Sequence, residues 1–409
     1  MAKYAIIDVA NMFSRARHVT QGDSFTKAGM ALSILFKSLN KAHRDLGADH
    51  MVFCIEGRSW RYDIYPEYKG KRVLLREMAS PQEKEEEEVF KQTLNSFVEY
   101  AREHTRATVL QHPRCEGDDF VARWIQVHPN DQHVIISSDS DFVQLLAPNV
   151  QIYDGVQERL LSIDGVVDKD GVPQVFNVCP STGRIKVKGS IKEAQEAFFK
   201  EQKLASRNHI NNEKERERAF ILSERKKNAA DPTYAPRPFV AQDFDWKEFD
   251  WAPEPEWWRK ALFVKLIRGD SSDGIFSAYP KVRYNGSSKK AGIHEAWEDR
   301  HKRGYVWNNF MLQTWEKLVR IDADGNKETK MVRVMDEYEI NRQLIDLTAQ
   351  PEEIRNLMDE TIVEQVSRPL VPAANVGFQF IKFCKNFDLP STAKEAQFHT
   401  TYLLKGYTR

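Results

Sequence analysis

Two kinds of hydrophobic pattern alternate along the first 155 residues, and this alternation restricts the fold more than any other feature of the chain. The helical kind is illustrated by Thr26–Leu46, which places Met30, Ile34, Leu35 and Leu39 on one face. Strands that alternate with helices predict an α/β fold, with a mainly parallel central sheet flanked by helices. The predicted strands are five short runs rich in β-branched or aromatic residues: Tyr4–Asp8, Met51–Ile55, Ala107–Leu110, His133–Ser137 and Val150–Tyr153.

The composition is typical of a soluble globular protein, with 41% hydrophobic and 29% charged residues among 409. We expect no membrane span, because no run of about eighteen apolar residues occurs. The N-terminus lacks the apolar stretch of a signal peptide. The four cysteines form no CxxC pair and show no zinc-like spacing with histidine, so we expect a reducing, cytoplasmic setting.

The patterns divide the chain into four segments. Residues 157–255 lose the alternation, and we expect an insertion or accessory lobe outside the core sheet, with a charged helix near Ile191–Asn228. We expect a helix at Trp257–Ile267 and a mostly helical C-terminal region with a turn at Asp322–Asn326. The predicted segments are a core at 1–156, the insertion at 157–255, a segment at 256–310 and a C-terminal region at 311–409.

The net charge is zero, with 60 basic and 60 acidic residues, so total charge gives no support for a nucleic-acid partner. The distribution of charge does give support. Six basic residues against two acidic ones lie between Gly57 and Arg76, and a largely acidic stretch follows directly at Glu83–Glu88. Either stretch could equally be a solvated face, so charge alone does not decide the function.

Acidic side chains follow three of the predicted strands. Asp8 ends the first strand, Glu56 follows the second, and Asp139 and Asp141 follow the fourth. Ligand sites of open parallel sheets lie beyond the carboxyl ends of the strands, so we expect these acids to converge. Further acids would join them from the start of a helix and from a later loop: Glu116, Asp118, Asp119, Asp270 and Asp273.

Several carboxylates in one cleft need positive charge between them. Two like charges about 4 Å apart cost on the order of 4 kcal/mol at an effective dielectric constant near 20. Oxygen ligands without histidine or cysteine favour Mg²⁺ or Mn²⁺, and two such ions promote phosphodiester hydrolysis. Each acid taken singly is explained as well by a turn or a helix cap; the evidence lies in their order and spacing together.

In that order, the motifs resemble those of the 5′ nuclease superfamily, which includes flap endonucleases, the 5′–3′ exonuclease domain of bacterial DNA polymerase I, and phage RNase H enzymes. The phage RNase H type is the most similar. Glu56 stands where the family usually has Asp, and Gly274 replaces the usual Asn. The matching segments are Ile6–Asn11, Phe53–Glu56, Trp60-Arg61, Tyr65–Lys69 with Arg72, Glu116–Asp119, Ser137–Phe142, Gly269–Asp273 and Tyr338–Leu347.

The resemblance implies a PIN/5′-nuclease-like fold with a helical arch at about 73–103 and a helix–turn–helix that binds duplex DNA within 256–310. It implies two Mg²⁺ ions, for which Mn²⁺ can substitute. The family's potassium-binding helix–turn–helix is poorly matched in 275–292, so a K⁺ site is left open. The implied ligands of the first ion are Asp8, Glu56, Glu116, Asp118 and Asp139, those of the second are Asp139, Asp141, Asp270 and Asp273, and Asp119 is an additional or outer ligand.

Catalytic roles are implied for Lys69 and Arg72 at the base of the arch, together with Asp8 and Asp139. Lys69 and Arg72 would neutralise the scissile phosphate. Tyr68 would stack on a base next to the cut. The implied nucleic-acid-binding residues are Arg61, Tyr68, Lys69, Arg72, Lys281, Arg283, Lys289 and Lys290.

The implied function is that of a monomeric, structure-specific 5′ nuclease of a bacterial or phage-infected cell, with 5′–3′ exonuclease and flap endonuclease activity in DNA replication, repair or recombination. Substrates would be 5′ flaps and nicked or gapped duplexes. Removal of RNA primers from RNA–DNA hybrids is left open, and so is a single-strand-binding protein or sliding clamp as a partner. The alternatives are a PIN-like single-strand ribonuclease and a catalytically inactive, flap-binding scaffold.

Overall fold

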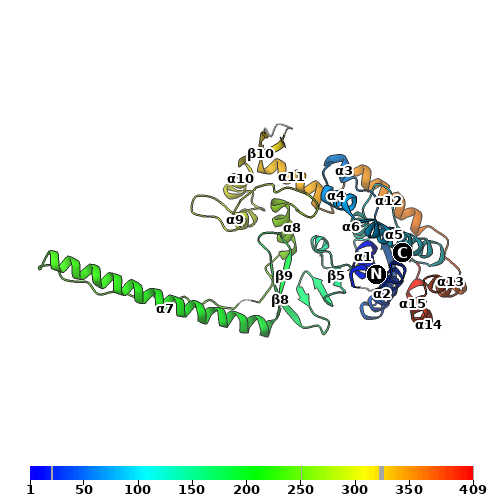
Figure 1. The fold of residues 1–409 in the computed structure, drawn as a ribbon, viewed down its shortest axis with the longest axis horizontal. Coiled ribbons are helices and arrows are strands. Elements are labelled where there is room, and N and C mark those ends of the chain that lie inside the picture. Colours follow the sequence, from blue (N-terminus) through cyan, green and yellow to red (C-terminus); the bar gives the residue numbers. More distant parts are fainter. Residues whose placement is uncertain (20–21, 250, 322–326, 409) are drawn as a thin grey trace.

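A twisted central sheet organises the protein, as the computed structural model shows for residues 1–19, 22–249, 251–321 and 327–408. In this described part the sheet has nine strands in the order β3-β2-β1-β4-β5-β6-β7-β8-β9 (Figure 1). The first five are parallel and confirm the five strands predicted from the sequence. They are β1 (Lys3–Asp8), β2 (His50–Cys54), β3 (Thr108–Leu110), β4 (Gln132–Ile136) and β5 (Val150–Asp154).

The strand register brings the ends of the central strands to one edge of the sheet. Asp8 at the end of β1 lies opposite Cys54, the last residue of β2. Its neighbour Ile7 lies opposite Ile136, the last residue of β4. Since parallel strands end at the same edge, any side chain that directly follows these strands enters one region of space.

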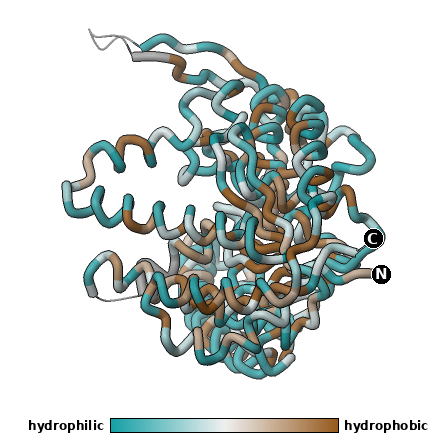
Figure 2. The backbone as a smooth tube through the Cα atoms, turned by 90° about the vertical axis from the view of Figure 1, so that its right-hand side faces the viewer, coloured by the Kyte–Doolittle hydropathy of each residue, from teal (hydrophilic) through white to brown (hydrophobic). Residues whose placement is uncertain are grey.

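Helices cover both faces of the parallel strands and create two apolar clusters. One face packs against α1 (Val9–Val19), α2 (Ser24–Leu46), α5 (Pro81–His104), α13 (Ala373–Asn386) and α15 (Ala396–Leu403). The other face packs mainly against α6 (Gly117–Val127), α8 (Trp257–Arg268) and α12 (Glu352–Val366). Brown, hydrophobic backbone accordingly concentrates inside the body in Figure 2, and teal segments lie outside.

The predicted apolar face of α2 is partly wrong. Leu35 and Leu39 are buried as expected, but Met30 is 47% exposed and Ile34 is 38% exposed. The buried face is instead completed by alanines such as Ala28 and by Leu32. Alanine contributes little to a hydrophobic pattern, although it allows close approach of a helix to its neighbours, so the pattern pointed about one position away from the true face.

Residues 159–190 continue the sheet, which corrects the prediction that the insertion lies outside it. They form β6 (Arg159–Ser162), β7 (Gly165–Val167), β8 (Pro173–Val178) and β9 (Ile185–Ser190), joined as antiparallel hairpins to β5. These strands are only half buried and carry polar and charged residues, so neither a continuous apolar run nor a clean alternation reveals them.

The rest of the insertion forms a long projection. Helix α7 (Ile191–Ala230) confirms the predicted charged helix and extends away from the body (Figure 1, green). The chain then returns along the helix without secondary structure, held by side chains of α7 that bind its backbone. Gln202 Nε2 donates to the carbonyl of Lys247 at 3.0 Å, and the buried carboxylate of Glu224 accepts from the amide of Arg237 at 3.0 Å.

The C-terminal half is less helical than predicted. Helix α8 confirms the one expected at Trp257–Ile267, and α11 (Val334–Ile345) contains much of the predicted Tyr338–Leu347 segment. Between them, β10 (Thr314–Ile321) pairs with β11 (Lys327–Arg333), where a helix was expected; the predicted turn at 322–326 lies outside the described residues. The remaining helices here are α9 (Ile293–Glu298), α10 (Tyr305–Met311) and α14 (Pro390–Lys394).

Two exposed segments correspond to the predicted nucleic-acid-binding elements. Helix α4 (Gly70–Met78) has no buried residue and joins α5 through a short turn, so a helical hairpin occupies the segment predicted as an arch. Residues 275–292 form turns and isolated bridges without a helix, and the two short helices α9 and α10 follow them. No helix in the described part is long and apolar enough to cross a membrane.

Candidate metal centre

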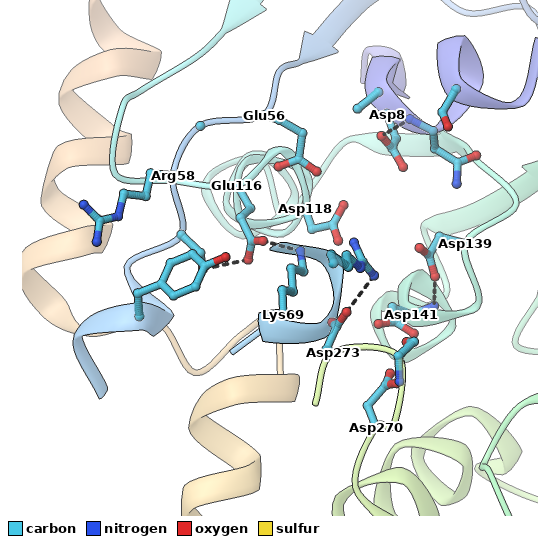
Figure 3. Close-up of a pocket in the computed structure, with 18 of the residues that line it drawn as sticks. Asp8, Glu56, Arg58, Lys69, Glu116, Asp118, Asp139, Asp141, Asp270 and Asp273 are labelled. Atoms are coloured by element: carbon cyan, nitrogen blue, oxygen red, sulfur yellow. Dashed lines mark hydrogen bonds and ion pairs between the residues drawn. The ribbon is translucent and has the colours of Figure 1, made fainter. Parts of the chain in front are cut away.

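Acidic side chains from separate parts of the chain line one pocket of about 740 Å³ at the carboxyl edge of the parallel strands. Figure 3 shows their carboxylates directed toward a common space, with Asp139 and Asp141 on one side and Arg58 on the other. The pocket confirms that these acids, distant in sequence, lie together. The acidic lining residues are Asp8, Glu56, Glu116, Asp118, Asp139, Asp141, Asp270 and Asp273.

The ends of β1 and β2 and the start of α6 fix three of these acids. Asp8 is 5% exposed, and its carboxylate accepts hydrogen bonds from the amide of Asn11 at 3.0 Å and from Ser137 Oγ at 3.1 Å. The carboxylate of Glu56 accepts from the amide of Gly117 at 3.2 Å. Asp118 lies in the first turn of α6, where the helix dipole favours negative charge.

Asp139 directly precedes the short 3₁₀ helix Ser140–Leu145 that follows β4, and Asp141 lies in its first turn. The amide of Asp139 donates to Ser137 Oγ at 3.0 Å, and the Asp139 carboxylate accepts from the amide of Asp141 at 2.9 Å. The same serine therefore binds both Asp8 and the backbone of Asp139, which ties the ends of β1 and β4 to each other.

A tight turn presents Asp270 and Asp273. The amide of Asp270 donates to the carbonyl of Ile275 at 3.0 Å, and the amide of Ile275 donates to the carbonyl of Asp270 at 2.8 Å, so this segment is a turn. Gly269 has φ +75°, and a Cβ there would lie 2.4 Å from the Ile275 carbonyl oxygen, so the close approach requires glycine.

Basic side chains neutralise part of this acidic set. Lys69 contacts Glu116, and Arg72 contacts Asp273 at 2.6 Å, which places both predicted catalytic cations at the pocket. Lys265, which sequence reasoning missed, contacts Asp141 at 2.5 Å and Asp270 at 2.7 Å. Its position five residues before Asp270, on a helix that packs on the sheet, is the signal that could have identified it.

Three acids of the pocket have too few cations nearby, and the pKa of each is raised: Asp8, Glu56 and Asp118. Burial, with a smaller contribution from Asp139, raises the pKa of Asp8 to about 6. The Glu56 side chain is exposed to the space of the pocket, yet the surrounding protein desolvates its carboxylate and raises its pKa to about 7, with Glu116 and Asp8 adding to the effect and Lys69 opposing it. The pKa of Asp118 rises well above its ordinary value, through burial and then the charges of Asp8 and Glu56.

The acids that contact lysine behave in the opposite way. Burial would raise the pKa of Glu116, but Lys69 and Arg61 outweigh it and hold the pKa below its usual range. Burial is likewise outweighed at Asp270, where Lys265 and hydrogen bonds from Ser272 lower the pKa. One group of carboxylates is therefore held ionised, and a second group is short of cations.

This arrangement fits divalent cations in its chemistry, though not yet as a preformed cage. The pocket is lined by eight acidic residues and by five basic ones, and all of the acidic donors are the hard oxygen ligands that Mg²⁺ and Mn²⁺ prefer. Among the residues that the structure describes, no group of three or more His, Cys, Asp or Glu side chains is already placed to hold one ion. Binding would therefore require side-chain rearrangement within the pocket.

Three predicted site residues do not face the pocket. Asp119 is fully buried, and its carboxylate contacts Arg61 at 2.9 Å and accepts from the indole of Trp60 at 3.1 Å, so it is not free to bind a metal ion. Arg61 is 1% exposed and also contacts Glu116 at 2.8 Å. Tyr68 is 3% exposed, and its hydroxyl donates to Glu116 at 3.2 Å.

The predictions that Arg61 and Tyr68 touch nucleic acid are therefore wrong. A cation at 1% exposure and a ring at 3% exposure have no surface for a phosphate or a base. Both side chains instead donate hydrogen bonds to the carboxylate of Glu116. The four predicted duplex-binding cations are exposed and lie outside the pocket: Lys281, Arg283, Lys289 and Lys290.

Other pocket residues were not assigned to the site from the sequence, although Arg58 and Arg76 lie in the basic stretch between Gly57 and Arg76. Arg58, Arg76 and Arg184 line the pocket, as do Asn11 and Ser14. Arg184 comes from the β8–β9 hairpin, which sequence analysis had placed in an insertion away from the core.

Comparison with known proteins adds independent information. Residues 3–174 match the family described as 5′-3′ exonuclease, N-terminal resolvase-like domain. Flap endonuclease Xni of Yersinia pestis bv. Antiqua (strain Angola) is 30% identical over 172 residues, which are 41% of this chain and 71% of that protein. Flap endonuclease Xni of Pseudoalteromonas translucida (strain TAC 125) is 30% identical over 130 residues, 31% of this chain and 46% of that protein. The match thus spans less than half of the latter relative.

Among solved structures, the T5 D15 protein co-crystallised with metal ions aligns with 88% of this chain and 98% of its own, at 14% identity and a TM-score of 0.48. A likeness at that score is too weak to establish anything further about this chain.

Proposed function

This chain belongs to the 5′ nuclease superfamily, and on that premise we propose that it is a divalent-metal-dependent hydrolase that cuts phosphodiester bonds at or near free 5′ ends of nucleic acid. One observation carries the proposal: eight carboxylates from separate segments line a single pocket, and Lys69 and Arg72 lie at the same pocket. Carboxylates in this number suit metal ions, and the two cations suit the phosphate that such ions would help to hydrolyse.

The carboxylates divide into two sets that could hold two ions. Asp8, Glu56, Glu116 and Asp118 lie nearer the ends of β1 and β2, and Asp141, Asp270 and Asp273 lie nearer α8, with Asp139 between the sets. Bound Mg²⁺ would neutralise charge on the phosphate and lower the pKa of water. Lys69 and Lys265 keep Glu116 and Asp270 ionised, so these carboxylates are ready to bind at neutral pH.

Lys69 and Arg72 would bind the scissile phosphate. Lys69 has φ 53°, a left-handed conformation, and directly precedes α4. Its amide donates to the carbonyl of Asp273 at 2.8 Å, which joins the base of the α4–α5 hairpin to the turn that carries Asp273. A positive side chain and an acidic ligand are thereby held in a fixed relation, as electrostatic stabilisation of a transferring phosphoryl group requires.

The substrates we propose are 5′ flaps and nicked or gapped duplexes, recognised by shape. Exposed α4 and the exposed start of α5 (residues 81–85) would guide the single strand, and the exposed cations of 281–290 would bind duplex phosphates without reading sequence. Removal of RNA primers belongs to the same proposal, since metal ions and cations that act on the scissile phosphate would not distinguish ribose from deoxyribose. We also propose that the protein acts as a monomer in the cytoplasm.

Two other functions make different predictions. A flap-binding scaffold would bind such DNA through Lys69, Arg72 and the exposed cations of 281–290 but would not cut it in Mg²⁺ or Mn²⁺. A PIN-like single-strand ribonuclease would not need the Gly269–Asp273 turn, whose Asp270 and Asp273 line the pocket here.

A 5′-labelled flap duplex tests the proposal. With Mg²⁺ we expect products with the label on a released mononucleotide or oligomer, no products in EDTA, and at least a hundredfold slower cleavage by Asp118→Asn. Binding without cleavage in Mg²⁺ or Mn²⁺ would establish the scaffold instead. Cleavage confined to single-stranded RNA would establish the ribonuclease, and a parallel RNA-primed duplex measures removal of RNA.

A further inference from the structure

The β8–β9 hairpin adds a wall to the acidic pocket. Arg184, which directly precedes β9, lines the pocket together with Asp139 and Asp141. It also lines a small adjoining cavity with Asp141 and Lys265, which places it on the α8 side.

The hairpin is fixed against α8 at the residue before Arg184. Gly183 has φ +72°, and a Cβ there would lie 2.4 Å from the Ala261 carbonyl oxygen and 3.0 Å from the Lys265 amide. Only glycine allows this backbone contact. Arg268 Nε also donates to the Pro180 carbonyl at 3.1 Å, so α8 holds both sides of the hairpin turn.

The guanidinium of Arg184 is available to a ligand. Arg184 is exposed, and its guanidinium forms no hydrogen bond or ion pair with any other described residue. Other basic residues of the pocket are engaged: Lys69 contacts Glu116, Arg72 contacts Asp273, and Arg76 contacts Glu87 at 3.3 Å. Arg58 lies over the ring of Tyr62 at 5.7 Å, on the far side of the pocket from Asp139.

We propose that Arg184 forms a phosphate-binding position on the Asp139–Asp141 side of the pocket, where it contacts a backbone phosphate of the substrate within one nucleotide of the cut. This inference rests on the proposed function. Guanidinium groups bind phosphate oxygens through two parallel N–H donors, and a phosphate entering an acidic pocket needs such a partner. The substrate would thus be held from two walls, by Lys69 and Arg72 on one and by Arg184 on the other.

The usual role of basic residues near edge strands, which is to hinder pairing with other chains, does not explain why Arg184 lines the pocket. Exposed lysines are common on edge strands, where they hinder pairing with other chains, and Lys186 and Lys188 on β9 fit that role. Neither of them lines the pocket. Lys186 is therefore a matched control, because Lys186→Ala removes the same charge from an exposed position two residues after Arg184 on the same hairpin.

A double-mutant cycle, in which a protein substitution is combined with removal of one phosphate charge from the DNA, tests the proposal. Wild type, Arg184→Ala, Arg184→Lys and Lys186→Ala are each combined with flap duplexes in which one phosphate near the cut is replaced by a neutral methylphosphonate. DNA affinity is measured by fluorescence anisotropy in Ca²⁺, which takes oxygen ligands but demands less strict geometry than Mg²⁺. Single-turnover cleavage is measured in Mg²⁺, and circular dichroism checks that each variant is folded.

We expect Arg184→Ala to weaken binding or slow cleavage at least tenfold, Arg184→Lys to recover part of the loss, and Lys186→Ala to change either value less than twofold. At one phosphate position, the methylphosphonate should reduce the affinity or cleavage rate of wild type much more than that of Arg184→Ala, because the variant already lacks the contact to that phosphate. Additive effects at every position, or equal losses in Arg184→Ala and Lys186→Ala, would overturn the proposal. If wild type binds but never cleaves, the proposed function fails while the binding cycle still decides the role of Arg184.

Discussion

Replacement of Asp8 by Asn should stabilise the metal-free protein while it removes a proposed metal ligand. Asp8 is 5% exposed, and its pKa rises from 3.8 to about 6 because burial outweighs hydrogen bonds from Asn11 and Ser137. A rise of that size corresponds to roughly 3 kcal/mol of preference for the neutral carboxyl in the folded protein. Asn keeps the shape and an acceptor oxygen for the Asn11 amide, and it carries no charge.

The direction in which the stability of wild type changes with pH follows from proton linkage. A folded-state pKa above the unfolded value means that the folded protein binds more protons between pH 3.8 and about 6. Wild type is therefore most stable, with respect to this group, below pH 3.8, and it loses that stability as the pH rises through about 6. Asp8→Asn does not lose it, so the variant should gain up to about 3 kcal/mol over wild type at pH 8.

Urea unfolding in EDTA at pH 8 and pH 4 measures this difference. The gain should fall below about 1 kcal/mol at pH 4, where Asp8 is already protonated in the folded state. Asp170→Asn, on an exposed turn, is the control and should change little at either pH. Mg²⁺ at pH 8 should stabilise wild type more than Asp8→Asn. An Asp8→Asn protein that is no more stable than wild type at pH 8 in EDTA, or equally stabilised at both pH values, would refute the electrostatic argument.

Three further substitutions test other parts of the structure. Arg61→Ala should lower the free energy of unfolding by about 3–5 kcal/mol, because it leaves the fully buried Asp119 without a cation and leaves Glu116 with Lys69 alone. Exposed Arg58→Ala should cost under about 1 kcal/mol in the same urea assay. Lys265→Met should lower thermal stability at pH 7, because it removes the cation that lowers the pKa of Asp270. In a thermal-shift series, this loss of stability should shrink below about pH 4, and added Mg²⁺ should restore part of it. Glu224→Ala should expose residues 231–240 to limited proteolysis, mapped by mass spectrometry, while Glu217→Ala on the same helix should leave the cleavage pattern unchanged.

The parallel half of the fold could be predicted because its signals are local. Buried strands such as β1 and β4 must be continuously apolar, and their acids follow within a few residues. The antiparallel extension could not be predicted in this way. Strands such as β6, with the sequence Arg159–Ser162, are short and half exposed, and they exist because β5 offers an edge for pairing.

The same distinction applies to the pocket. Asp8, Glu56 and Asp139 could be assigned because each is tied to a strand end. Arg61 was misassigned because a basic residue in a basic stretch suggests exposure, whereas its burial depends on Glu116 and Asp119, which lie 55 and 58 residues later. Such distant partners leave no trace in local hydrophobic or charge patterns.

The direct junction between β9 and α7 has a mechanical consequence. Helix α7 begins at the residue after β9, and a capping box of Ser190 and Glu193 stiffens that joint. Forty helical residues make a lever arm of about 60 Å. A force applied at the free end of this arm therefore exerts torque on β9 first, and the strand it would twist is the one that begins beside Arg184.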